Sequence, residues 1–157
     1  MQRLPALLFA SCLVFPAVAA DDQTPLAIVQ RLFAAMATHD AAAARELFVP
    51  EAQLFSVRAD GTTAAMPHDR WLDRWGASKD TWLERIWNPK PLEHSPIAVV
   101  WAEYDFHLNG KFSHCGIDSF SLLKTATGWK IAYISDTRET TGCTPSPLGP
   151  PSSTPRP

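Results

Sequence analysis

The sequence predicts an α+β domain in which N-terminal helices pack on one face of an antiparallel sheet. Apolar residues recur at helical spacing through much of the first half. Residues 97–136, by contrast, are β-prone and contain Asn109-Gly110, a typical hairpin turn. A chain of 157 residues is long enough for one such domain and too short for two of ordinary size.

The first two predicted helices have recognisable ends. Thr24 is a typical N-cap residue, and Pro25 follows it at the first helical position. Apolar residues then recur at helical spacing as far as Met36, so we expect the first helix over this stretch. Asp40 is expected to cap a second, alanine-rich helix that Pro50 stops.

A short strand and a third helix are expected next. Residues 53–58 alternate in polarity and lead into an Asp-Gly turn, which together predict a strand. In residues 68–76 the spacing places Trp71 and Trp75 on one face of a helix, and the glycine at the end of this stretch can terminate it.

The rest of the domain is predicted to form strands. Residues 81–87 alternate imperfectly and are followed by Pro89 and Pro91, which we expect to interrupt the strand. Three further strands are expected to be joined by the Asn-Gly turn and by a turn near Gly128, and they cover residues 97–107, 111–124 and 129–136.

Both ends of the chain are expected to lie outside the domain, which we place at residues 21–140. Residues 1–20 combine Arg3, an apolar run and small residues before a cleavage point, the pattern of a secretory signal peptide. The alternative is a lipoprotein signal in which Cys12 is acylated. Residues 141–157 are rich in Pro, Ser and Thr, so we expect a disordered tail.

The predicted signal peptide implies a periplasmic or secreted location for the mature chain. Without the signal, 13 basic residues stand against 16 acidic ones, and a net charge of −3 does not attract nucleic acid. No later stretch approaches the ~20 apolar residues of a membrane span. Cys115 and Cys143 would remain as an even pair, either joined as a disulfide in an oxidising compartment or present as two free thiols.

The hairpin around the Asn-Gly turn contains the candidate catalytic residues. With a two-residue turn, Asp105 lies opposite His114 and Trp101 lies opposite Asp118. Because side chains alternate along a strand, carboxylates and imidazoles gather on one predicted face. That face comprises Trp101, Glu103, Asp105, His107, Phe112, His114, Gly116 and Asp118.

A carboxylate opposite an imidazole is the minimum equipment for proton transfer. We expect His114 to act as a base oriented by Asp105, with Asp118 or Glu103 as the acid, since burial raises the pKa of a carboxyl group. The alternative is a solvated sheet face on which Asp105 and His114 form only a surface pair. The histidines lack the spacing of a zinc site, so no metal is expected.

Five further residues are candidates for ligand contacts. Trp101, Glu103 and Phe120 accompany the predicted catalytic face. Arg58 is a candidate partner for a ligand anion, the alternative being an exposed arginine at a strand end. Trp71 is a candidate wall for a flat aromatic ligand, although most of the six tryptophans are expected in the core.

Residues 97–137, IAVVWAEYDFHLNGKFSHCGIDSFSLLKTATGWKIAYISDT, resemble the nuclear transport factor 2-like superfamily. Within it the chain is most similar to small bacterial lumazine-binding and ketosteroid isomerase-like proteins, through Ala-Val-Val-Trp-Ala, the Asn-Gly turn, His-Cys-Gly-Ile-Asp and Gly-Trp-Lys-Ile. The resemblance extends more loosely over residues 24–137. It implies a cone in which helices and a curved sheet enclose a cavity, and a homodimer formed through the outer sheet face near Tyr104 and Ile117.

Together these features predict an exported protein whose cavity binds a small cyclic or aromatic organic molecule. No cofactor is expected, and the catalytic version of this hypothesis is acid-base proton transfer of the isomerase or dehydratase type. The catalytic set of a ketosteroid isomerase does not transfer residue by residue, because Tyr104 is expected on the face opposite Asp105. The alternative function is a non-catalytic ligand-binding or dimeric assembly module.

Overall fold

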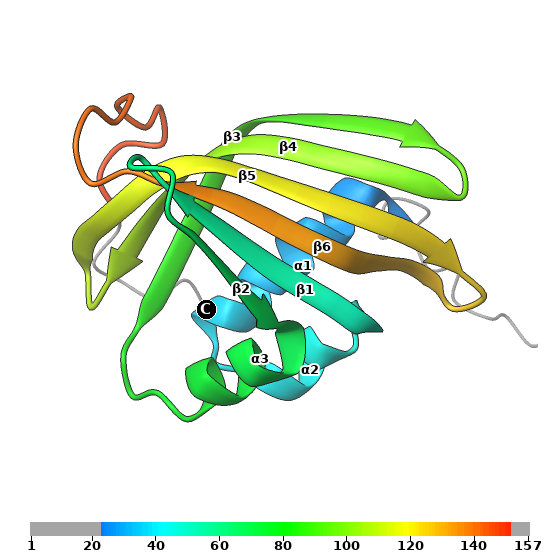
Figure 1. The fold of residues 1–157 in the computed structure, drawn as a ribbon. Coiled ribbons are helices and arrows are strands. Elements are labelled where there is room, and N and C mark those ends of the chain that lie inside the picture. The colour runs from blue at the N-terminus through cyan, green and yellow to red at the C-terminus, as the bar shows by residue number, and fades with distance from the viewer. Residues whose placement is uncertain (1–22, 152–157) are drawn as a thin grey trace, which may run out of the picture.

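The computed structural model describes residues 23–151, which form a curved, open six-stranded sheet and three helices (Figure 1). The helices are α1 (Pro25–Ala37), α2 (Ala41–Arg45) and α3 (His68–Gly76). The strands are β1 (Phe48–Arg58), β2 (Thr63–Pro67), β3 (Trp82–His94), β4 (Ile97–Leu108), β5 (Lys111–Thr125) and β6 (Gly128–Arg138). The predicted α+β class is therefore confirmed. The predicted signal peptide lies outside the described residues.

The first two helices begin directly after their predicted N-cap residues, Thr24 and Asp40. Thr24 Oγ1 accepts a hydrogen bond from the Ala27 amide at 3.1 Å, and Asp40 Oδ1 accepts one from the Ala43 amide at 2.9 Å. The apolar face of α1 packs against β3, β4 and β6, whereas α3 packs against β1 and β2 (Figure 1). Helices α1 and α3 thus cover the concave face of the sheet, and α2 packs against both of them. None of the helices in the described part of the chain has the length and apolar content needed to cross a membrane.

The strand order is β2-β1-β6-β5-β4-β3, and every pair is antiparallel except β1 and β6, which run parallel. The short edge strand β2 was not predicted. The other edge strand, β3, continues through Pro89 and Pro91, where an interruption was expected. A register shift between Trp87 and Lys90 accommodates Pro89, whereas Pro91 pairs with Val100. An edge strand tolerates both prolines because it pairs on one side only.

The predicted register of the β4–β5 hairpin is wrong beyond its first two pairs. Leu108 pairs with Lys111 and His107 with Phe112 as expected, but Phe106 then pairs with His114, which leaves Ser113 as an extra residue in β5. Such a bulge moves every following side chain of β5 to the other face relative to β4. The inner face consequently combines Val100, Ala102, Tyr104 and Phe106 with His114, Gly116, Asp118 and Phe120.

The first part of the predicted tail is attached to the domain. Cys115 and Cys143 form a disulfide with a Cα–Cα distance of 6.0 Å. Of the two alternatives that the sequence left open, a disulfide or two free thiols, the structure has the disulfide. Arg85 Nη1 donates a hydrogen bond to the Gly149 carbonyl oxygen at 2.9 Å. The segment from Cys143 to Gly149 is therefore held against the outer face of the sheet. Residues 152–157 lie outside the described residues.

Candidate functional site

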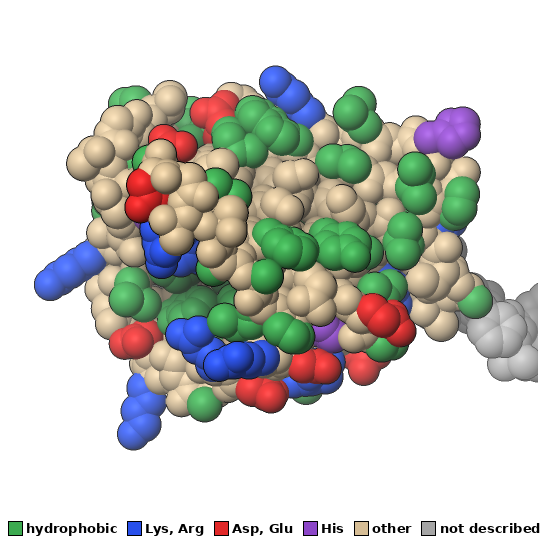
Figure 2. All heavy atoms as spheres, in the orientation of Figure 1, with side chains coloured by type: hydrophobic (Ala, Val, Ile, Leu, Met, Phe, Trp, Pro, Cys, Tyr) green, Lys and Arg blue, Asp and Glu red, His purple; other side chains and the backbone are tan. Residues whose placement is uncertain are grey.

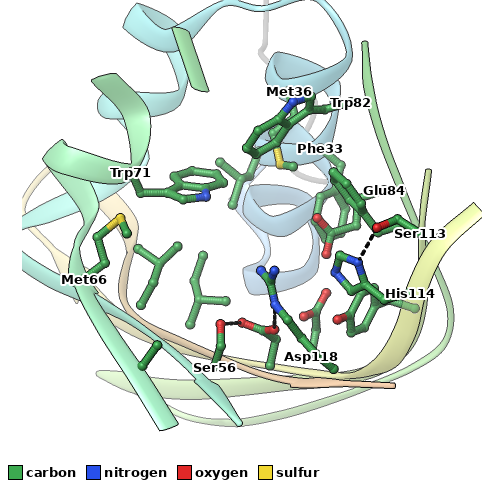
Figure 3. A pocket seen from close by; sticks show the side chains of 18 of the residues that line it. Phe33, Met36, Ser56, Met66, Trp71, Trp82, Glu84, Ser113, His114 and Asp118 are labelled. Carbon is green, nitrogen blue, oxygen red and sulfur yellow. Dashed lines mark hydrogen bonds and ion pairs between the residues drawn. The ribbon is translucent and has the colours of Figure 1, made fainter. Parts of the chain in front are cut away.

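A cavity of about 520 Å³ lies between the helices and the inner face of the sheet. Figure 3 shows Phe33, Met36, Met66, Trp71 and Trp82 around this space, contributed by α1, β2, α3 and β3. Most of the remaining wall is also apolar, and it includes Leu32, Leu54, Phe106, Phe120 and Ile134. A space of this size with mostly apolar walls suits a small organic molecule.

Two carboxyl groups, Glu84 on β3 and Asp118 on β5, point into the same part of this cavity (Figure 3). Burial raises the pKa of Glu84 to about 7. Burial, followed by the negative charge of Glu84, raises the pKa of Asp118 well above its usual value. Asp118 is only 1% exposed, and its Oδ2 atom has no hydrogen-bond partner among the described residues. At neutral pH the pair therefore retains a proton and faces the space that a ligand would fill.

His114 lies beside this pair as a neutral imidazole. Burial and, to a lesser extent, the positive charge of Arg138 lower the pKa of His114 to about 4. The ring stacks on Phe106 with 4.9 Å between centroids, and its Nδ1 atom lies 3.0 Å from Ser113 Oγ. A neutral imidazole has one donor and one acceptor nitrogen, so the second nitrogen is suited to a hydrogen bond with a ligand.

Tyr104 is fixed by the end of β6. Its hydroxyl group donates a hydrogen bond to the Thr137 carbonyl oxygen at 2.8 Å, and burial raises its pKa so that the group stays protonated. The prediction that Tyr104 points to the outer face is wrong. Tyr104 lines the cavity, and the bulge at Ser113 brings His114 and Asp118 to the same face. Its phenol ring meets the His114 ring edge to face at 5.8 Å between centroids, so Tyr104 positions His114.

A charged pair closes the polar side of the cavity. Ser56 Oγ donates to Asp136 Oδ1 at 2.6 Å, and Arg138 Nε donates to Asp136 Oδ2 at 2.8 Å. The Asp136 side chain is 13% exposed and that of Arg138 is 47% exposed, so this pair reaches from the cavity to the surface. Among the described residues no cluster of three or more His, Cys, Asp or Glu side chains could hold a metal ion.

The structure brings together five of the residues predicted for the site. His114, Asp118, Phe120, Arg58 and Trp71 all line the cavity. Within this set, the first three come from β5, Arg58 ends β1, and Trp71 lies on α3.

Three predicted site residues lie instead on the outer face. Asp105 forms an ion pair with Arg85, whose Nε donates to Asp105 Oδ1 at 2.8 Å, and so it cannot orient His114. Lys90 lies over the Trp101 ring, and Asn88 donates to Glu103. The cause is again the extra residue in β5. In a regular hairpin Asp105 would share a face with His114, whereas the extra residue places them on opposite faces.

The polar residues of the site that were not predicted include Glu84, Tyr104, Asp136 and Arg138. A signal for Glu84 existed in the alternation of residues 81–87, because Trp82 and Glu84 share one side of a strand. Likewise Asp136 and Arg138 follow Ile134 at two-residue spacing. Aligning these strands with the hairpin, however, requires the strand order, which only the tertiary structure shows.

The sequence matches the family described as putative lumazine-binding over residues 20–133. The chain therefore belongs to this family, and its fold is that of the nuclear transport factor 2-like superfamily. No curated protein matches the sequence significantly.

Solved structures share the fold at low sequence identity. A nuclear transport factor 2-like protein of unknown function from Shewanella baltica is 16% identical, with a TM-score of 0.57 over 74% of this chain and 91% of that one. A putative dehydratase from Streptomyces avermitilis is 13% identical, with a TM-score of 0.59 over 76% and 96%. A superfamily member from Salmonella enterica is 20% identical, with a TM-score of 0.55 over 73% and 89%. At these identities the similarity establishes the fold and not the activity.

Proposed function

We propose that the cavity binds a small cyclic organic molecule and transfers a proton within it without a cofactor. The observation on which this rests is the Glu84–Asp118 pair, two carboxyl groups of raised pKa that face a mostly apolar cavity. Enzymes that move protons near neutral pH raise carboxyl pKa values by burial in this way. The family description and the dehydratase-like neighbour are in accord with the proposal.

The two carboxyl groups divide the work in the proposed reaction. Glu84 titrates near neutral pH, so its ionised form accepts a proton from a carbon next to a carbonyl group of the ligand. Asp118 is more deeply buried and keeps its proton, which it donates to the carbonyl oxygen as the C–H bond breaks. Return of the proton from Glu84 to another carbon, while the enol gives its O–H proton back to Asp118, restores the carbonyl group and both side chains and so completes an isomerisation. In a dehydration, Glu84 would instead pass its proton to a hydroxyl group that leaves as water, and the enol would again return its proton to Asp118.

His114 has a different role from the one that the sequence suggested. An imidazole with a pKa of about 4 is a weak base at neutral pH. Its free nitrogen can instead donate a hydrogen bond to the oxygen that gains negative charge during the reaction. Asp105 has no part in the proposed mechanism, because it is paired with Arg85 on the outer face.

The proposed location remains the periplasm or the extracellular space. The Cys115–Cys143 disulfide supports it, because such bonds persist in oxidising compartments. Fractionation of cells that express the full chain, with a gel run under non-reducing conditions, tests this part. Reduced protein found only in the cytoplasm would contradict it.

The binding and the chemistry can be tested with one set of compounds. Purified protein is titrated with lumazine, a β,γ-unsaturated ketosteroid and bicyclic phenols, with calorimetry as the readout of binding. Ligands that bind and have a C–H bond next to a carbonyl group, as the ketosteroid has, are then incubated in heavy water, and NMR follows exchange of these hydrogens. We expect binding and accelerated exchange, and we expect Glu84→Gln to abolish exchange while binding persists.

Glu103→Gln is the matched control, because Glu103 lies on the outer face and accepts a hydrogen bond from Asn88. This variant should exchange ligand hydrogens as the wild type does. Binding without any exchange would support the alternative, a non-catalytic ligand-binding module. The absence of binding by every compound would contradict the proposal as a whole.

A further inference from the structure

Three arginines line the cavity: Arg58 at the end of β1, Arg74 on α3 and Arg138 at the end of β6. Arg58 and Arg74 are exposed, and neither forms an ion pair with another described residue. Arg138 contacts Asp136 through Nε, so its two terminal nitrogens remain available. The cavity lining therefore contains guanidinium N–H groups that form no hydrogen bond or ion pair with the described residues and are available to a ligand.

Two acidic residues of the lining, Asp136 and Asp80, in contrast already have hydrogen-bond partners. Asp136 accepts hydrogen bonds from Ser56 and Arg138. Asp80 accepts from Asn109 Nδ2 at 2.8 Å and from Ser78 Oγ at 3.3 Å. Asp60 lies outside the lining but near the positive charge of Arg58. It accepts a hydrogen bond from the Thr62 amide at 2.8 Å. The Glu84–Asp118 pair retains a proton because burial raises both pKa values.

The arginines stand where the cavity opens to solvent. Arg58, Ser113, His114 and Arg138 also line an adjoining, more open groove that residues 139–141 complete. Figure 2 shows a hollow with apolar side chains inside it and basic side chains on two sides of its opening. A ligand whose ring fills the apolar interior would therefore place its outer end among guanidinium groups.

We propose that the natural ligand is an amphipathic organic anion, with a ring system in the cavity and a carboxylate or similar oxyanion held at the opening by Arg58 and Arg74. This inference rests on the binding role proposed above. A guanidinium group presents paired N–H donors that match an oxyanion. The charged end stays near solvent, which avoids the large cost of burying it, while the ring is removed from water.

Matched acid and ester pairs test the inference, because each pair has the same ring system and differs in charge. The probes are 2-naphthoate with its methyl ester and cholate with its methyl ester, and calorimetry measures their dissociation constants. For the wild type we expect each acid to bind about tenfold more tightly than its ester, and the advantage to shrink as salt is added. Arg58→Gln and Arg74→Gln should each weaken binding of the acid about fivefold and leave the ester unchanged.

Arg31→Gln is the control, since Arg31 is an exposed arginine on α1 that lines neither the cavity nor the groove. It should preserve the preference for the acid. Equal binding of acids and esters would overturn the inference and leave the proposed binding function standing. A preference for the acid that survives in both Arg58→Gln and Arg74→Gln would also overturn it. Failure of all four probes to bind would contradict both proposals.

Discussion

At the scale of single residues, Glu84 links the cavity to pH. In the folded protein its pKa is about 7, above its ordinary value of 4.5, so the folded state binds a proton more tightly than the unfolded state does. The stabilisation from this proton is fully present below about pH 4.5 and is lost as the pH rises to about 7. Glu84→Gln removes this effect. Relative to the wild type, the variant should therefore gain about 1–2 kcal/mol between about pH 5 and pH 8.

Urea unfolding of both proteins at the two pH values measures this gain. The comparison with the wild type cancels the contribution of His114, which has the opposite sign. The pKa of His114 is lowered to about 4, so its contribution to stability is present above about pH 6.5 and is lost toward pH 4. A difference between variant and wild type that does not change with pH would show that Glu84 is not buried as described.

Gly116 is required by the protein itself rather than by a ligand. A Cβ atom at this position would lie 2.1 Å from the Thr137 carbonyl oxygen, the same atom that accepts the hydrogen bond from Tyr104. Gly116→Ala should therefore lower the free energy of unfolding by about 3 kcal/mol, because backbone would have to move. Chemical unfolding measures the change. Ser119→Ala, on the same strand, is the control and should cost less than about 1 kcal/mol. Equal losses would contradict the close approach.

At the scale of elements, the disulfide fastens the C-terminal segment to β5. Glu139 pairs with Cys115 through two backbone hydrogen bonds of 2.9 and 3.0 Å. Cys143, four residues further along the chain, forms the disulfide with the same Cys115. The same segment, through residues 139–141, forms one wall of the groove next to the cavity. Loss of the disulfide should therefore both destabilise the fold and loosen this wall.

Replacement of both cysteines by serine is the direct test. A bridge across a separation of 28 residues should stabilise the folded state by about 3 kcal/mol, mainly by restricting the unfolded chain. We expect the melting temperature of the variant to fall and to become insensitive to reductant. The wild type in reductant should approach the same value. An unchanged melting temperature would show that the bridge does not form in solution.

At the scale of the whole molecule, the outer face of the sheet remains our predicted homodimer interface. Of the two residues first assigned to it, Ile117 points outward and Tyr104 does not. Phe55 and Tyr133 are exposed there, and their rings stack at 6.0 Å between centroids. Tyr133→Glu should shift a dimer to monomer in sedimentation experiments. A wild type that is monomeric at all concentrations would contradict the prediction.

Much of the fold could be predicted because its signals are local. Thr24 and Asp40 cap helices through contacts within three residues, and the Asn-Gly turn forms a hairpin wherever it occurs between β-prone segments. The pairing of β1 with β6 could not be predicted in this way. It joins strands that are far apart in the chain and run parallel, so no turn specifies it.

The sequence by itself determined the α+β class and the family, and it singled out His114, Asp118, Phe120, Arg58 and Trp71 as candidate site residues. The tertiary structure decided which acid accompanies His114. A single extra residue, Ser113, reverses the faces of β5 relative to β4, so Asp105 turns outward to Arg85 while Glu84 and Asp118 meet inside. The physical reason is that side chains alternate with a period of two, so a shift of one residue exchanges the two faces. Burial of Tyr104, Phe106 and Phe120 on the inner face favours this register over the regular hairpin.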